Sequence, residues 1–244
     1  MTFLSPEEWA RYQRQIMLPE VGEEGQRKIK SAKVFLSGLG GLGSVSAYYM
    51  AAAGVGHLRV VDRDRVELGN LNRQILYGCG DIGRPKTDTA MERLHGLNPE
   101  CSVEAIHEEI REDNASDLIG DCSVIVDGMD NLKARITLNE ASLQKGIPLI
   151  FGGVEGIDGM VTTFVPGETP CLECLFPGKV SGQKTVGVLG PLPGLVASIQ
   201  ALETLKYLLG MEGLLKCRLL SIRGSDMTIK TIRIERNPHC RVCG

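Results

Sequence analysis

Short apolar runs alternate along the chain with segments whose apolar residues recur at helical spacing. The runs predict buried strands at residues 32–38, 57–61, 102–110, 122–130 and 148–154. Helices are expected between them at residues 42–53, 86–98 and 132–146, with a polar loop from 62 to about 84. Such alternation builds a parallel sheet with right-handed crossovers. The pattern therefore predicts an α/β fold with a Rossmann-like, mostly parallel sheet flanked by helices.

The pattern changes after Gly159. We expect a strand at 160–166, a Gly-rich loop at 171–190, a long helix at 193–210, and a C-terminal β-hairpin from two strands at 217–222 and 228–234. A soft boundary near 155–160 divides the chain into residues 1–158, with N-terminal helices, and residues 159–244. We expect the two parts to pack together as one compact domain.

Composition narrows the class of protein. The 244 residues are 43% hydrophobic and 23% charged, and 27 basic against 30 acidic residues give a net charge of −3. That balance argues against a nucleic-acid or anionic-membrane surface. The run "AYYMAAAGVG" is too short for a membrane span of about 20 residues, and the N-terminus has no apolar signal core. A cytoplasmic protein is expected, in which cysteines serve as thiols or metal ligands.

A glycine-rich turn follows the first expected strand. Gly38, Gly40 and Gly43 fit G-x-G-x-x-G, with Gly41 inside the turn and Asp62 placed 19 residues after Gly43. Glycines allow a tight turn and close approach of N–H groups to phosphate, and the carboxylate suits ribose hydroxyls. Alone, this pattern favours NAD or FAD over ATP, and the alternative is a Gly-rich turn without a ligand.

Cationic residues after the second strand favour ATP instead. Asn70, Arg73 and Lys86 are expected at the carboxyl end of the sheet, where ligands bind. The guanidinium of arginine can donate two N–H groups to one phosphate, and the ammonium of lysine adds a positive charge, so both suit a triphosphate. Asp127 and Asp130 end a strand on the same rim, where a carboxylate can hold Mg²⁺. The alternative is that the cations only pair with neighbouring aspartates.

Two C-x₂-C pairs stand far apart in the sequence. Cys171 and Cys174 form "CLEC", and Cys240 and Cys243 form "CRVC". In a cytosolic chain two such pairs indicate a tetrahedral Zn²⁺ site, and four protein ligands make the metal structural. Redox dithiols are the alternative.

The segments "RYQRQIMLPEVGEEGQRKIKSAKV", "GLGGLGS", "VDRDRVELGNLNRQ", "DIGRPK" and "DGMDNLKAR" occur in this order. With them the chain resembles the ThiF/MoeB/HesA family of ubiquitin-activating-type adenylyltransferases, across residues 11 to 243. The resemblance implies that ATP·Mg²⁺ is used to adenylylate the C-terminal carboxylate of a small ubiquitin-fold sulfur carrier ending in Gly-Gly. Pyrophosphate would be released, and the carrier would serve molybdopterin or thiamin sulfur transfer.

Roles for individual residues also follow from the resemblance. Asp62 would contact the ribose, Asp130 would hold magnesium within the pattern D-N-x-x-x-R completed by Arg135, and Arg14 would reach the partner's site in a homodimer. The implied catalytic residues are Arg14, Arg73, Lys86 and Asp130. The implied nucleotide-binding residues are Gly38, Gly40, Gly41, Gly43, Asp62, Asn70, Arg73, Gln74, Lys86, Asp130 and Asn131. Residues 1–158 would bind nucleotide, and residues 159–244 would bind the carrier and zinc.

One loop departs from the family pattern. Many members carry a cysteine just before "GVLGP", where this sequence has Gln183, and no cysteine lies between Cys174 and Cys217. We therefore expect the reaction to stop at the acyl-adenylate unless another thiol, with Cys79 the candidate, replaces the missing one. The chain ends at Gly244 without a sulfurtransferase domain, so a separate sulfur donor is expected.

Two other classes stay open at this stage. One is an NAD- or FAD-dependent oxidoreductase, and the other is a scaffold that binds ATP without turnover. The sequence also leaves open which sulfur pathway the carrier serves.

Overall fold

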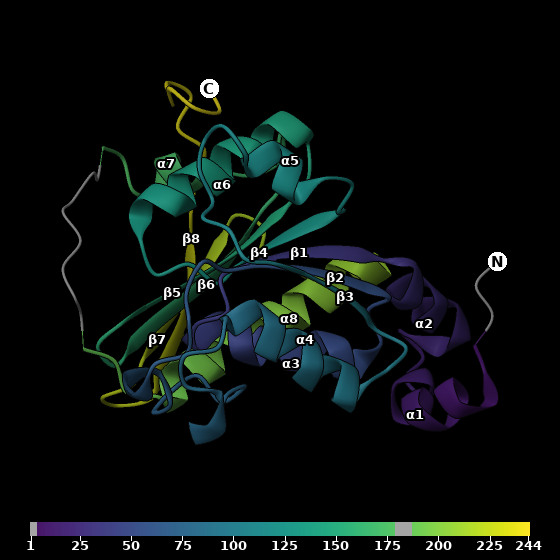
Figure 1. Cartoon of the computed structure of the whole chain (residues 1–244). Helices are drawn as coiled ribbons and strands as arrows, with labels where there is room; N and C mark the ends of the chain where they lie inside the picture. The colour runs from purple at the N-terminus through teal and green to yellow at the C-terminus, as the bar shows by residue number, and fades with distance from the viewer. Residues whose placement is uncertain (1–3, 179–186) are drawn as a thin grey trace.

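The computed structural model describes residues 4–178 and 187–244 (Figure 1). Its longer helices are α1 (Pro6–Ile16), α2 (Gly22–Ser31), α3 (Gly41–Ala53), α4 (Lys86–Leu97), α6 (Leu132–Lys145) and α8 (Pro191–Leu209). The short ones are α5 (Ala115–Ile119), α7 (Leu172–Leu175), and the 3₁₀ turns η1 (Leu68–Asn70) and η2 (Cys79–Asp81). The strands are β1 (Lys33–Ser37), β2 (His57–Val61), β3 (Ser102–Ile106), β4 (Val124–Asp127), β5 (Leu149–Glu155), β6 (Asp158–Phe164), β7 (Arg218–Arg223) and β8 (Thr228–Arg233).

All these strands form one sheet in the order β3-β2-β1-β4-β5-β6-β7-β8. The members from β3 to β5 pair in parallel, whereas β5–β6, β6–β7 and β7–β8 are antiparallel. The expected α/β class, the mostly parallel sheet and the C-terminal hairpin are confirmed. The strands on either side of residues 155–160 pair directly, from Leu149 with Phe164 to Glu155 with Asp158. The sheet therefore runs without a break through this part of the chain.

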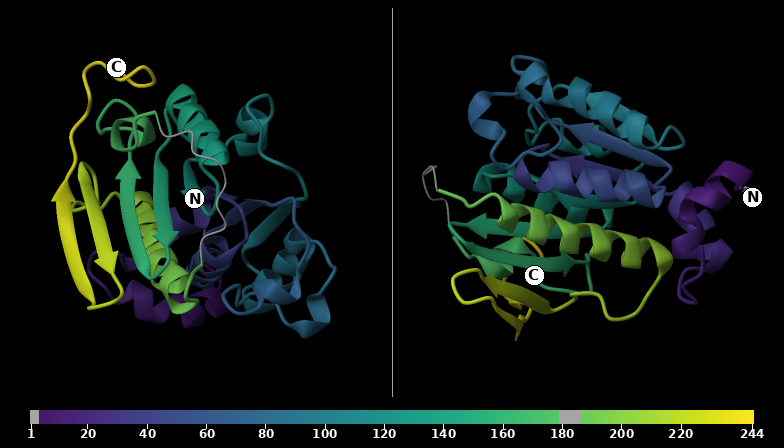
Figure 2. Two further views of the ribbon diagram at one scale, coloured as in Figure 1. Left: turned by 90° about the vertical axis from the view of Figure 1, so that its left-hand side faces the viewer. Right: turned by 90° about the horizontal axis from the view of Figure 1, so that it is seen from below.

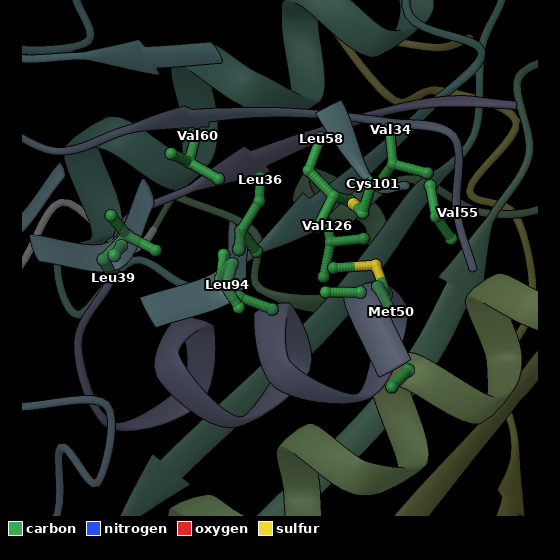
Figure 3. Packing of buried hydrophobic residues seen from close by; sticks show 14 of the residues in the cluster. Val34, Leu36, Leu39, Met50, Val55, Leu58, Val60, Leu94, Cys101 and Val126 are labelled. Carbon is green, nitrogen blue, oxygen red and sulfur yellow. The ribbon is translucent and has the colours of Figure 1, made fainter. Parts of the chain in front are cut away.

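Helices cover both faces of the sheet (Figure 1). Helices α3, α4 and α8 lie on one face, and α5, α6 and α7 lie on the other. Successive side chains of a strand point to opposite faces. Val34 and Leu36 of β1 therefore enter the first layer (Figure 3), and Phe35 enters the second. All three are fully buried. Burial on both sides explains why the strands appear as continuous apolar runs.

Helix α3 packs against α8 through small side chains. Ala47 and Ala51 are fully buried, and Ser46 Oγ donates to the Ala197 carbonyl at 3.2 Å. Small residues let two helix backbones approach closely, and Figure 2 shows the two helices side by side. This contact places the start of α8 next to the start of α3, where the glycine-rich turn lies.

Some boundaries differ from the sequence-based expectation. Strand β3 ends at Ile106 rather than at 110, because Ile110 leaves the sheet and is buried with α5 and α6. Strand β4 ends at Asp127 rather than at 130, because the Asp127 carboxylate accepts the Met129 N–H at 2.9 Å and turns the chain. Helices α5 and α7 were not expected. In the described residues, no helix is both long and apolar enough to cross a membrane.

Candidate nucleotide site and cysteine cluster

The glycine-rich turn links β1 to α3 at the carboxyl edge of the parallel strands. Gly38 has a φ of +78°, which favours glycine. A Cβ at Gly43 would lie 1.9 Å from the Gly38 carbonyl oxygen, so the helix could not start this close to the strand with any larger residue. The first and last glycines of the motif are thus required by the backbone.

Asp62 ties this turn to the end of β2. Its carboxylate accepts the Leu39 N–H at 2.7 Å and the Asp64 N–H at 2.7 Å. Burial raises the pKa of Asp62, and the positive charge of Lys86 partly offsets this rise. The carboxylate expected at the nucleotide ribose therefore lies directly beside the glycine-rich turn.

Lys86 brings a buried ammonium group to the same edge. It is the first residue of α4, its side chain is 5% exposed, and Nζ lies 3.0 Å from Asp64 Oδ2. The Lys86 N–H also donates to the Asp64 carbonyl at 3.0 Å. Two contacts with one residue fix the position of the lysine beside Asp62.

The loop after β2 supplies three polar side chains. Asn70 accepts the Glu67 N–H at 3.1 Å, and Arg73 Nη1 donates to the Gly69 carbonyl at 2.9 Å. Arg73 Cγ would lie 3.5 Å from a Cβ at Gly41. Gln74 is buried next to the turn, and its Oε1 has no hydrogen-bond partner among the described residues. Since buried polar atoms are usually hydrogen-bonded, this oxygen has capacity left to accept a hydrogen bond from a water or a bound group.

The start of α8 closes the site from the other side, and sequence reasoning missed it. A Cβ at Gly41 would lie 3.1 Å from Pro193, and a Cβ at Gly190 would lie 2.4 Å from the Asn72 carbonyl oxygen. The small residues and prolines in "GVLGPLPG" were the available signal. They allow this segment to pack tightly against both the glycine-rich turn and the Arg73 loop.

Asp130 lies on the loop that follows β4, the other neighbour of β1. The side chain is exposed, and Asn131 Nδ2 lies 3.5 Å from its Oδ1. Asn131 also begins α6, because its Oδ1 accepts the Ala134 N–H at 2.9 Å. The loop touches the glycine-rich turn, since a Cβ at Gly38 would lie 2.9 Å from the Gly128 carbonyl oxygen. An exposed carboxylate with an adjacent amide fits the oxygen ligands that Mg²⁺ prefers.

Arg14 is not part of this group within one chain. It is exposed on α1, and α1 contacts the far end of α3, where Gln15 Nε2 donates to the Ala53 carbonyl at 3.1 Å. Helix α3 has 13 residues and is therefore about 20 Å long, with the glycine-rich turn at its opposite end. Figure 1 shows α1 at the edge of the molecule.

The two cysteine pairs meet as expected. Sγ atoms lie 3.9 Å apart for Cys171–Cys174, 3.7 Å for Cys171–Cys240 and 3.5 Å for Cys174–Cys243. A tetrahedron of Zn–S bonds of about 2.3 Å has edges of about 3.8 Å, so the cluster fits this metal. Burial works against a lower pKa at Cys240, yet the Cys243 and Val242 N–H groups lower that pKa to about 7.

The fold and the glycine-rich turn define an α/β protein of the Rossmann-like class. Arg73 lies close to this turn, and Lys86 lies beside Asp62. The model of the ThiF family matches residues 12–242, and the chain belongs to this family.

Its relatives include the SAMP-activating enzyme E1 of Haloferax volcanii, which is 43% identical over 96% of this chain and 88% of its own length. The sulfur carrier protein adenylyltransferase of Thermus thermophilus is 42% identical over 98% of this chain and 92% of its own length. Among solved structures, the E. coli MccB structure with ATP has a TM-score of 0.83 and 25% identity, covering 96% of this chain and 73% of that one. The predicted family and enzyme class, an adenylyltransferase, are confirmed.

Proposed function

We propose that this chain adenylylates the C-terminal glycine carboxylate of a small ubiquitin-fold sulfur carrier that ends in Gly-Gly, with release of pyrophosphate. The observation that carries the proposal is the meeting of three segments at the glycine-rich turn. Lys86 lies beside Asp62, whose carboxylate accepts an N–H of the turn, and Arg73 lies against Gly41. The loop of residues 128–131, called the Asp130 loop, touches Gly38. The names of the Haloferax and Thermus relatives support a carrier protein as the substrate.

The chemistry needs cations more than it needs a base. An oxygen of the carrier carboxylate attacks the α-phosphorus of ATP, the bond to the β-phosphate oxygen breaks, and pyrophosphate leaves. The attacking group is already an anion, so the barrier lies in bringing two anions together in line. Arg73 and Lys86 would neutralise the phosphates, Asp62 would hold the ribose, and Asp130 with Asn131 would hold Mg²⁺, which supplies further positive charge.

The distance of Arg14 from its own glycine-rich turn supports a homodimer. In a C₂ dimer the arginine of one chain can reach the site of the other. Tyr49 and Leu202 are 55% and 57% exposed beside a groove between α1, α3 and α8, and we propose that the second copy covers this face. Arg11 and Gln15 line the same groove, so a partner seated there would approach Arg14.

Zinc in the cysteine cluster would be structural, because four thiolates fill a tetrahedral shell. All eight cysteines lie in the described residues and none of them forms a disulfide, which supports a reducing compartment such as the cytoplasm. We further propose that the carrier belongs to a molybdopterin, thiamin or related sulfur pathway. A separate donor would supply the sulfur.

ATP with Mg²⁺ is expected to bind tightly, and NAD is expected to bind at least about 10-fold more weakly. The reason is that the cations at the glycine-rich turn match a triphosphate. A 10-fold difference in Kd corresponds to about 1.4 kcal/mol of binding free energy. Isothermal titration calorimetry with each nucleotide measures this difference. Tighter binding of NAD would instead favour an oxidoreductase, and ATP binding without carrier-dependent pyrophosphate exchange would favour a scaffold.

Cys79→Ser is expected to retain ATP–pyrophosphate exchange, and intact mass spectrometry of wild type with its carrier should show no thiol-sensitive adduct. Gln183 lies outside the described residues, but an amide cannot form a thioester. Burial raises the pKa of Cys101 to about 12 and that of Cys122 to about 11, whereas Cys79 is exposed at η2 and is therefore the thiol to test. An adduct that forms with wild type and disappears in Cys79→Ser would refute an adenylation-only reaction.

A further inference from the structure

Arg135 joins three segments beneath the Asp130 loop. It lies one turn into α6, and Nη2 donates to the Met129 carbonyl at 2.6 Å and to the Gly152 carbonyl of β5 at 2.7 Å. The guanidinium also lies over the Phe151 ring, 5.0 Å from its centroid. The side chain is 16% exposed, so these contacts are made largely out of solvent.

Asp127 is the acidic partner of this arginine. Its side chain is 1% exposed, and Oδ2 lies 3.2 Å from Arg135 Nε. Neither atom makes an aligned hydrogen bond within the described residues. The pair is therefore held by charge, and the guanidinium takes its orientation from the two carbonyls. Burial raises the pKa of Asp127, and Arg135 counteracts this shift.

Hydrogen bonds hold the chain at Gly128 and Met129, the two residues before Asp130. Asp127 is paired with Ser37 in the sheet, and the Gly128 N–H donates to the Ser37 carbonyl at 2.8 Å. The Met129 N–H is held by Asp127, and the Met129 carbonyl is held by Arg135. That carbonyl belongs to the peptide bond that continues into Asp130. Arg135 thus sets the peptide plane directly before an exposed carboxylate.

We propose that Arg135 is a positioning residue that aims the Asp130 carboxylate at the Mg²⁺ of bound ATP. The inference rests on the proposed role of Asp130. The Asp130 loop lies against the glycine-rich turn, since a Cβ at Gly38 would be 3.2 Å from Met129 Sδ. A rotation of the Met129–Asp130 peptide would therefore move the carboxylate relative to the phosphates. Groups that orient metal ligands in this way change metal affinity by about 10- to 100-fold.

A double-mutant cycle separates positioning from a general contribution to folding. The variants are Arg135→Lys, Asp130→Asn and the pair, and the measurement is the Mg²⁺ concentration that gives half-maximal binding of a fluorescent ATP analogue. Arg135→Lys is expected to raise this concentration about 10-fold. It should leave nucleotide affinity in EDTA unchanged. In the Asp130→Asn background the same change should have no further effect, because residues that act as a unit are not additive.

Arg59→Lys is the matched control. Arg59 is 18% exposed, pairs with Glu104 at 2.7 Å and donates to the Ile119 carbonyl at 3.2 Å, but it lies on β2 and these partners lie on β3 and α5. The Arg59→Lys variant should have a lower melting temperature, and the Mg²⁺ dependence of its nucleotide binding should not change. If Arg135→Lys is poorly folded, Arg135→Gln serves as the second variant, because its amide can still donate to one carbonyl.

An unchanged Mg²⁺ dependence in a folded Arg135 variant would overturn the inference, and so would full additivity with Asp130→Asn. If Asp130→Asn alone leaves the Mg²⁺ dependence unchanged, the proposed metal role of Asp130 is what fails. The two failures are therefore distinguishable.

Discussion

An equimolar mixture of Arg14→Ala and Lys86→Ala chains is expected to regain about a quarter of the wild-type rate of ATP–pyrophosphate exchange. Each variant alone should be on the order of 10³-fold slower, by analogy with the loss of a cation supplied in trans in phosphoryl transfer. Recovery follows because a heterodimer has one site with both cations and one with neither. Random exchange makes about half of the dimers mixed, each with half of its sites intact.

A second mixture provides the control. Arg73 and Lys86 approach the same glycine-rich turn of one chain, so mixing Arg73→Ala with Lys86→Ala leaves every site defective. That mixture should show no recovery. If confirmed heterodimers of Arg14→Ala and Lys86→Ala are also inactive, Arg14 does not act across the dimer.

Loss of one cysteine ligand is expected to have the second large effect. Structural zinc sites in small peptides bind with roughly 10–16 kcal/mol of apparent free energy at neutral pH. Cys240→Ser should therefore lower the zinc content from one ion per chain to well below one and make the residues after β8 sensitive to protease. ATP binding should persist, because the cluster lies at α7 and the C-terminus, whereas the glycine-rich turn lies between β1 and α3. Elemental analysis and limited proteolysis measure the two effects.

Cys217→Ser is the matched control for this experiment. Cys217 precedes β7, and its Sγ lies 3.9 Å from the Glu168 carbonyl oxygen rather than beside another sulfur. The zinc content and protease resistance of the Cys217→Ser variant should equal those of wild type. Wild-type protein that contains no zinc and has four titratable thiols in the cluster would contradict the proposed metal site.

The sheet could be predicted because its signals are local. Val34, Phe35 and Leu36 are buried on alternating faces, so β1 gives a continuous apolar run that the sequence displays directly. The glycine-rich turn is equally local, since Gly38 and Gly43 meet within a few residues of chain. Even the cysteine cluster has a spacing rule that extends across long separations.

Contacts between distant segments could not be predicted. The prolines and small residues around Pro193 allow close packing but do not indicate that the partner is Gly41, and nothing near Arg135 indicates that it donates to Gly152. Both contacts depend on how the sheet brings helices α6 and α8 to its edge. The position of Arg14 at the far end of α3 likewise becomes visible only when α1 is placed against Ala53.

With zinc bound as proposed, the cysteine cluster would also impose an order of events on the newly made chain. Cys171 and Cys240 are 69 residues apart, and α8, β7 and β8 lie between them. If the cluster binds zinc as proposed, the first pair can supply only two of the four ligands during synthesis until the hairpin has emerged. A polypeptide interrupted within β7 or β8 would never complete the set. The ratio of bound metal to protein in a preparation would then count the chains that were translated through the hairpin and folded.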